Sequence, residues 1–111
     1  MLTTPKRLIY PTLATTTTTP IYTAVSKTII TKLTIENSTS SDVTVTIYLL
    51  GQNVTPSVAN ALILHKLIPA YSTYDCTEAY GHVLEANDSI SVDSSSDTAA
   101  YVQASGLVIT Y

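Results

Sequence analysis

The chain has little of the chemistry on which most enzymes and disulfide-bonded proteins rely. Its 111 residues include no tryptophan, no phenylalanine, three glycines and a single cysteine. One cysteine excludes an intrachain disulfide. Asp75 and Glu78 lie beside Cys76 in the sequence, and their charges are expected to raise the pKa of its thiol. We therefore interpret Cys76 as an ordinary, partly buried residue.

Charge and long apolar runs are also scarce. Charged residues make up 12% of the chain, only five are Lys or Arg, and the formal net charge is −3. Without a basic stripe, nucleic-acid binding is not expected. No apolar run approaches the roughly 20 residues that span a bilayer, so no membrane partner is expected. Pro11 interrupts the N-terminal "MLTTPKRLIYPTLA", which predicts no secretory signal and synthesis in a cytoplasm.

Catalytic and metal-binding patterns are missing as well. The two histidines, His65 and His82, show no zinc-site spacing, and no Gly-x-Ser-x-Gly turn supports a serine nucleophile. Asp88, Asp93 and Asp97 recur near two turns, but the Gly and Glu offsets of an EF-hand are absent. We predict no enzyme, no cofactor and no metal site, and interpret these carboxylates as solvated turn residues.

Alternating apolar and polar residues are the strongest positive signal. Residues 29–36 ("IITKLTIE") and 43–50 ("VTVTIYLL") each place apolar side chains at every second position. This period is typical of half-buried antiparallel strands. The polar "NSTSSD" between them has the length of a hairpin loop, so the two strands are predicted to form a hairpin.

The second half of the chain continues with short strands. Residues 61–68 ("ALILHKLI") are predicted as a strand ending before Pro69, with a short helix as the alternative. A further strand is expected in 70–76, and a left-handed turn residue at Asn87-Asp88. The final "AYVQASGLVITY" is predicted as a long strand in which Gly106 marks a bulge or a close approach.

Seven to nine short strands and no helical apolar stripe predict an all-β fold. We expect a single antiparallel β-sandwich, Ig-like or jelly-roll-like, with a small barrel as the alternative. The predicted core consists of the inward positions of the alternating strands: Ile29, Leu33, Ile35, Val43, Val45, Ile47, Leu49, Ile90, Val92, Val102 and Val108.

Residues 1–20 are predicted to form an extended N-terminal arm beside a sandwich domain over residues 21–111. The segment "PTLATTTTTP" lies between two prolines and holds five consecutive threonines, which disfavour a helix. One interpretation is a mobile or edge-lying arm. The other is that the arm adds a strand to a neighbouring subunit, with these threonines at the interface: Thr15, Thr16, Thr17, Thr18 and Thr19.

The eight tyrosines are the only aromatic residues. Three have the parity of the face opposite the predicted core, and exposed tyrosine is typical of protein interfaces. These predicted interface residues are Tyr48, Tyr101 and Tyr111. A different group, close together in sequence, offers a patch for carbohydrate or receptor binding: Tyr71, Tyr74, Asp75, Tyr80 and His82.

Four segments cover roughly residues 20–110: "IYTAVSKTIITKLTIENSTSSDVTVTIYLL", "NALILHKLIPAYSTYD", "VLEANDSISV" and "AAYVQASGLVIT". Together they resemble a group of small β-sandwich structural proteins of tailed bacteriophages. In that group glycine is expected in the turns where this chain has Tyr71 and Asn87.

The resemblance implies a virion component present in several copies. Its location would be the capsid (a decoration or cement protein), the neck or tail, or a fibre base. Its expected partners are other virion structural proteins and further copies of itself. No catalytic residues carry over from such a resemblance, and sandwich folds serve many functions.

Overall fold

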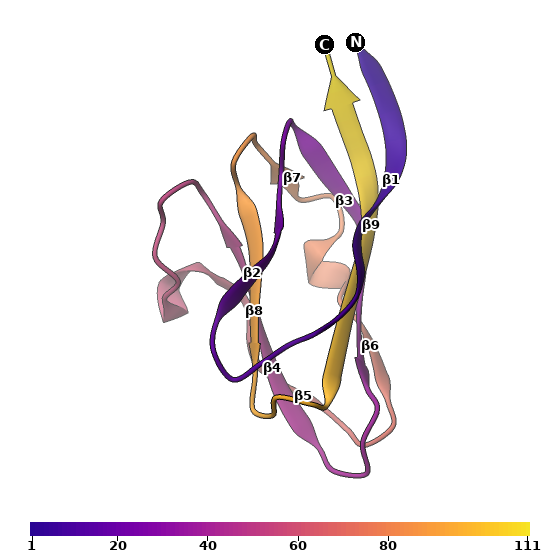
Figure 1. The fold of residues 1–111 in the computed structure, drawn as a ribbon, viewed down its shortest axis with the longest axis vertical. Helices are drawn as coiled ribbons and strands as arrows, with labels where there is room; N and C mark the ends of the chain where they lie inside the picture. The colour runs from indigo at the N-terminus through magenta and orange to yellow at the C-terminus, as the bar shows by residue number, and fades with distance from the viewer.

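The computed structural model describes residues 1–111 and consists of strands arranged in two antiparallel sheets (Figure 1). Sheet A contains, in spatial order, β1 (Leu2–Leu13), β9 (Ala100–Thr110), β3 (Thr28–Asn37) and β6 (Thr73–Asp75), with β7 (Val83–Leu84) also paired to β3. Sheet B contains β2 (Thr19–Thr23), β8 (Ser89–Ser94), β4 (Val43–Leu50) and β5 (Ala61–Ile68). Two short 3-10 turns, η1 (Val58–Asn60) and η2 (Thr77–Ala79), lie in the connections. The prediction of an all-β fold is confirmed.

No helix in this structure combines the length and the apolar character needed to cross a bilayer.

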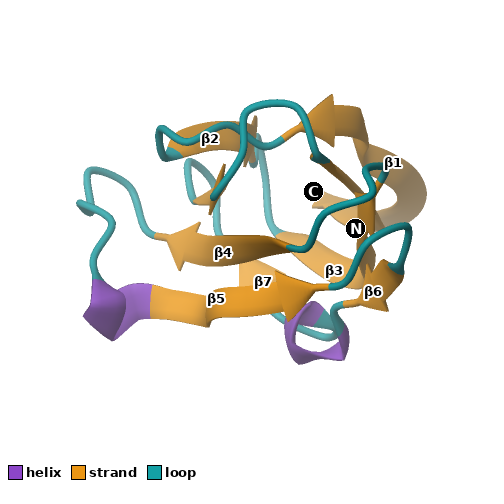
Figure 2. Ribbon diagram, turned by 90° about the horizontal axis from the view of Figure 1, so that it is seen from below, coloured by secondary structure: helices purple, strands orange, loops and turns teal.

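The strand pairs are nested. Apart from β7, the first strand pairs with the last, and the successive inner pairs are β2 with β8, β3 with β6, and β4 with β5. The members of each pair run antiparallel. Figure 2 shows β2, β4 and β5 on one side of the molecule and β1, β3 and β6 on the other. A single hydrophobic cluster of 22 buried residues draws on both sheets.

The N-terminal segment is extended, as predicted, but it does not stand apart as an arm. β1 pairs with β9 from Leu2 opposite Thr110 to Leu13 opposite Tyr101, and it buries Leu8 and Ile9 in the core. The chain then crosses to sheet B, where β2 runs through the predicted boundary at residues 20 and 21. Proline and β-branched residues specify an extended chain, but they do not specify which partner it pairs with.

The prediction that residues 29–36 and 43–50 pair as a hairpin is wrong. Both segments are strands, but β3 lies in sheet A and β4 in sheet B, so the polar connector crosses between the sheets. Buried Asn37 fixes this crossing: its side-chain amide donates to the carbonyl oxygens of Ser41 and Ile68 at 2.7 and 3.1 Å. Its side-chain oxygen accepts from the backbone and hydroxyl of Thr39. Alternation of apolar and polar residues shows that a strand has one buried face, but it does not specify which other strands it pairs with.

Nine of the eleven predicted core residues are buried, and the exceptions are Ile29 and Leu49, which are half-buried. A register shift between Ile30 and Lys32 changes the phase of β3, so that Ile30 enters the core in place of Ile29. Gly106 lies opposite Ile30 at this irregularity. A side chain there would collide with the carbonyl oxygen of Ile29, which confirms Gly106 as a close-approach point.

Three non-glycine residues with positive φ mark irregular points in the second half. His65 (φ 48°) lies within β5, which is a strand rather than the alternative short helix, and it interrupts the alternation of that strand. Asn87 (φ 74°) is the left-handed turn residue that the sequence predicts. β5 ends at Ile68, the residue before Pro69, as the sequence predicts. Tyr71 (φ 55°) lies in the turn that follows and adopts a backbone conformation that favours glycine.

Substitution of Gly106 tests the close approach. A Cβ at Gly106 would lie 2.8 Å from Cδ1 of Leu8 as well as against the Ile29 carbonyl, so Gly106→Ala is expected to destabilise the fold by about 1–3 kcal/mol. Urea unfolding measures this. Gly51→Ala is the control, because its Cβ would lie 3.4 Å from Cγ2 of Val54, a contact with room to adjust. Equal stabilities of the two variants would contradict the packing described for β3 and β9.

Deletion of residues 1–13 tests whether β1 is part of the fold. Burial of the Leu8 and Ile9 side chains contributes about 3–6 kcal/mol, against a typical net stability of about 5–15 kcal/mol. We expect the truncated chain to lose cooperative thermal unfolding. Removal of residues 1–3, none of which is buried, is the control. A truncated chain that unfolds as cooperatively as the full one would restore the separate-arm interpretation.

Candidate functional site

The largest hollow in the molecule lies between the two sheets, where sheet A is closed only by the two residues of β7. It has a volume of about 380 Å³ and receives side chains from the end of β4, the start of β5 and the segment from His82 to Asp88. Leu49, Leu62 and Leu84 make its wall mostly apolar. A small apolar cleft with few polar groups is the usual form of a ligand or side-chain pocket.

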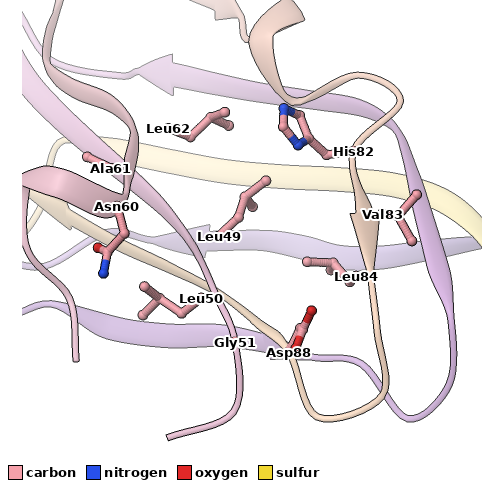
Figure 3. Close-up of a pocket in the computed structure, with 10 residues that line it drawn as sticks. All are labelled: Leu49, Leu50, Gly51, Asn60, Ala61, Leu62, His82, Val83, Leu84 and Asp88. Carbon is pink, nitrogen blue, oxygen red and sulfur yellow. The ribbon is translucent and has the colours of Figure 1, made fainter. Parts of the chain in front are cut away.

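The polar groups of this hollow do not converge. In Figure 3, His82 and Asp88 lie on opposite sides of the hollow, with Leu49 and Leu84 between them. One carboxylate oxygen of Asp88 accepts a hydrogen bond from the backbone of Glu85 at 2.9 Å, which closes the turn before β8. The lining contains no serine, threonine, cysteine, lysine or tyrosine. The hollow is suited to receive an apolar group, and its residues supply no nucleophile beside a base.

The carboxylates considered for metal binding are dispersed. Asp93 accepts a hydrogen bond from the Thr18 hydroxyl at 2.7 Å, and Asp97 accepts from the backbone and hydroxyl of Thr16 at 2.8 and 3.0 Å. Nowhere do three His, Cys, Asp or Glu side chains gather as metal ligands would. Cys76 is fully buried, and this burial raises the pKa of its thiol to about 11, with a further contribution from Glu78.

The predicted interface threonines connect the two sheets and are bound within the chain. Besides the bonds of Thr16 and Thr18, the Thr15 carbonyl accepts from the Ser94 backbone at 2.8 Å. The hydroxyls of Thr15 and Thr19 both donate to the carbonyl oxygen of Thr17. This segment is therefore held against the end of β8 and the turn that follows it, which the run of five threonines did not indicate.

The three predicted interface tyrosines lie in three different places. Tyr48 is on the outer face of sheet B but is buried there; desolvation raises its pKa, and the nearby charge of Asp93 raises it further. Tyr101 is 37% exposed on sheet A, opposite Glu36 in the register of β3 and β9. Tyr111 is exposed at the C-terminus. They do not form one surface.

The tyrosine group considered for carbohydrate binding is also divided. The Tyr74 hydroxyl donates to both carboxylate oxygens of Glu78 at 2.6 and 2.7 Å, which lowers the pKa of Glu78. The Nζ of Lys66 lies 4.8 Å from the centroid of the Tyr74 ring. Tyr80 packs against the core with its hydroxyl buried, whereas Tyr71 is exposed. These side chains offer no shared stacking platform.

The outer face of sheet B is the most distinctive surface of the molecule. Leu64 and Leu67 of β5 are 44% and 53% exposed, and neither packs against the core. The adjacent outward positions of β4 and β8 carry uncharged side chains, of which Thr44 is half-buried and Thr46, Tyr48 and Ser91 are buried. Asp93, bound to Thr18, is the only carboxylate among them. We name these seven residues the sheet B face. Its exposed apolar part is the two leucines, and exposed apolar side chains rimmed by polar ones are typical of a contact surface.

Comparison of this chain with protein-family models, with curated proteins and with solved structures gives no match.

The link between Thr16 and Asp97 predicts a pH dependence of stability. Hydrogen bonds from the Thr16 backbone and hydroxyl lower the pKa of Asp97 in the folded chain. The stabilisation is therefore complete above the pKa of the unfolded chain, about 3.9, and is lost as the pH falls through the lower folded value. Urea unfolding at pH 7 and pH 3 should show a smaller acid-induced loss for Asp97→Asn than for the natural chain. Asp75→Asn is the control, because the Asp75 side chain accepts no hydrogen bond. Its loss of stability between pH 7 and pH 3 should equal that of the natural chain.

Proposed function

We propose that this chain is a non-enzymatic structural component of a bacteriophage virion. Its proposed role is that of a capsid decoration (cement) protein that bridges and stabilises neighbouring subunits. The observation that carries the proposal is the pair of exposed leucines of the sheet B face, Leu64 and Leu67. Their side chains are unfavourable to leave in water and favourable to cover with a partner, and the one carboxylate of the face is hydrogen-bonded to Thr18.

We further propose that the two sheets form a single β-sandwich of the jelly-roll kind rather than the Ig-like kind. The nested pairing of first with last strand, second with second-last and so inward supports this choice. Jelly rolls occur in viral capsid and lectin domains among others, so the fold is compatible with the proposed role without specifying it. The backbone φ angles of Tyr71 and Asn87 are positive, and these are the two positions where the phage group is expected to have glycine. This agreement supports the proposed relation to that group.

The bridging contact would be made by the sheet B face rather than by a free threonine arm. Thr15–Thr19 are bound within the chain, as described above. β1 is a long edge strand of sheet A, but Pro5 and Pro11 remove two of its backbone donors, which makes it a poor template for an added strand. Side-chain contacts of moderate strength, repeated over a lattice of identical subunits or in a homo-oligomer, would give a high total affinity.

Neck, tail or fibre-associated positions in the virion are the alternative, since the same surface could serve there. The other alternative is a carbohydrate- or receptor-binding module. The dispersion of Tyr71, Tyr74 and Tyr80 removes the site first considered for that activity.

Charge introduced into the sheet B face tests the proposal. With purified particles of the phage whose genome encodes the chain, the natural protein is expected to co-sediment and to be located by cryo-electron microscopy. Leu64→Asp and Leu67→Asp together should lower particle affinity by roughly tenfold or more, because burying unpaired charge in an apolar contact is unfavourable. Co-sedimentation over a range of protein concentrations measures the change.

Val25→Asp is the matched control, since Val25 is 84% exposed in the turn between β2 and β3, away from the sheet B face. It should bind particles as the natural chain does. A coding gene located outside any phage genome would contradict the virion assignment. Full particle binding by the double aspartate variant would instead contradict the surface assigned to it.

A further inference from the structure

A second surface, on the outer face of sheet A, carries two of the five cations of this acidic chain. A hollow of about 310 Å³ is lined by Arg7 of β1, Lys32 of β3 and the polar side chains between them. An adjoining hollow of about 350 Å³ shares Arg7 and Ser105. Arg7 and Lys32 therefore lie together, although the net charge of the chain is −3.

The register of the strands explains this gathering. Ser105 of β9 is opposite Arg7 on one side and Lys32 on the other, so the three residues form one row across three neighbouring strands. Neighbouring strands are about 4.8 Å apart, which places the two cationic residues about 10 Å apart with Ser105 between them. The guanidinium of Arg7 lies 4.9 Å from the centroid of the Tyr10 ring, an interaction that helps to hold it over the sheet.

Arg7 and Lys32 form no ion pair within the chain. The one ion pair of the chain joins Lys27 to Glu85, and Lys66 lies over Tyr74. No carboxylate lines either hollow. A cluster of unpaired cations repels itself, so a bound anion would be stabilised there by at least two charge-assisted hydrogen bonds.

The neutral groups of the hollow are also free to bind. The side chains of Thr34, Thr73, Gln103 and Ser105 line the space around the cations and form no hydrogen bond within the chain. They supply hydroxyl and amide groups that can both donate and accept. β9 and β3 are paired on both sides, so their backbones offer no edge to a peptide, and recognition on this face must use side chains.

Two carboxylates on the same sheet repel an anionic ligand from one end of the row. Asp75 of β6 is opposite Thr34, and Glu36 lies two residues beyond Thr34 on β3. An anionic ligand is therefore directed away from β6, along the row from Lys32 through Ser105 to Arg7.

We propose that this row binds an acidic oligosaccharide. Arg7 and Lys32 contact its carboxylate or sulfate groups, and Ser105, Gln103 and Thr34 hydrogen-bond its hydroxyls. The site lies on the opposite sheet from the sheet B face, so it does not depend on the proposed role in the virion, and either can fail without the other.

Isothermal titration calorimetry with the full chain measures binding to this site. The probes are an oligogalacturonate for carboxylate, a heparin-derived hexasaccharide for sulfate, maltohexaose as the neutral sugar and an oligoglutamate as the acidic peptide. Binding of at least one acidic oligosaccharide is expected, weakening as sodium chloride is raised. Arg7→Gln together with Lys32→Gln should lower that affinity at least tenfold. Lys27→Gln together with Lys66→Gln removes the same charge elsewhere and should have little effect.

Several results would overturn the proposal. The first is that neither acidic oligosaccharide binds. The second is that both double variants lose affinity for the acidic oligosaccharide to the same extent. The third is that maltohexaose binds as tightly as the acidic oligosaccharide does. Tighter binding of oligoglutamate than of either acidic sugar would reassign the row to an acidic protein segment. All four substituted residues are at least partly exposed, and the thermal unfolding midpoint of each variant checks that the fold is intact.

Discussion

The antiparallel pairing of β1 with β9 joins the two ends of the chain, and the closure of the core depends on it. The pairing continues past β1, where the backbone of Ala14 donates to the Ala100 carbonyl at 2.8 Å. It places Leu8 and Ile9 over the same core that β3 and β9 cover. From Ala14 the chain crosses to sheet B, and β2 then pairs with β8. Without this outer pair, β9 would be an unpaired edge and one side of the core would face water.

The two sheets turn different chemistry toward their surroundings. The outer face of sheet B carries leucine, threonine and a buried tyrosine, whereas sheet A carries cations, carboxylates and amides on its outer face. A rigid β-fold can present two such surfaces on opposite sides at the same time, since side chains alternate between the faces of a strand. Contact with a protein partner and capture of an anionic ligand would therefore not compete for the same residues.

Polar connections hold the crossings between the sheets. Asn37 is fully buried, yet its amide donates to backbone carbonyls of two other segments and its oxygen accepts from Thr39. A buried amide with all its groups satisfied costs little and fixes one arrangement, whereas an unsatisfied one would be strongly unfavourable. Thr16 with Asp97 and Thr18 with Asp93 make comparable links on the surface. The abundance of threonine and serine thus serves the loops as much as the strands.

Local sequence by itself determined that the chain is made of strands and where most of them lie. It also determined which side chains of β8 and β9 face inward, and most of those of β3 and β4, with Ile29 and Leu49 as the exceptions. Period-2 alternation, β-branched residues and the turn residues Pro69 and Asn87 act over a few neighbouring positions, so they can be read without a structure. Only the tertiary structure decided that β3 and β4 belong to different sheets, that residues 1–13 close sheet A, and that Arg7 and Lys32 share a row. These features arise from pairing between segments far apart in the chain, and alternation is equally compatible with many partners. A one-residue bulge such as that opposite Gly106 then shifts the phase of every side chain that follows it.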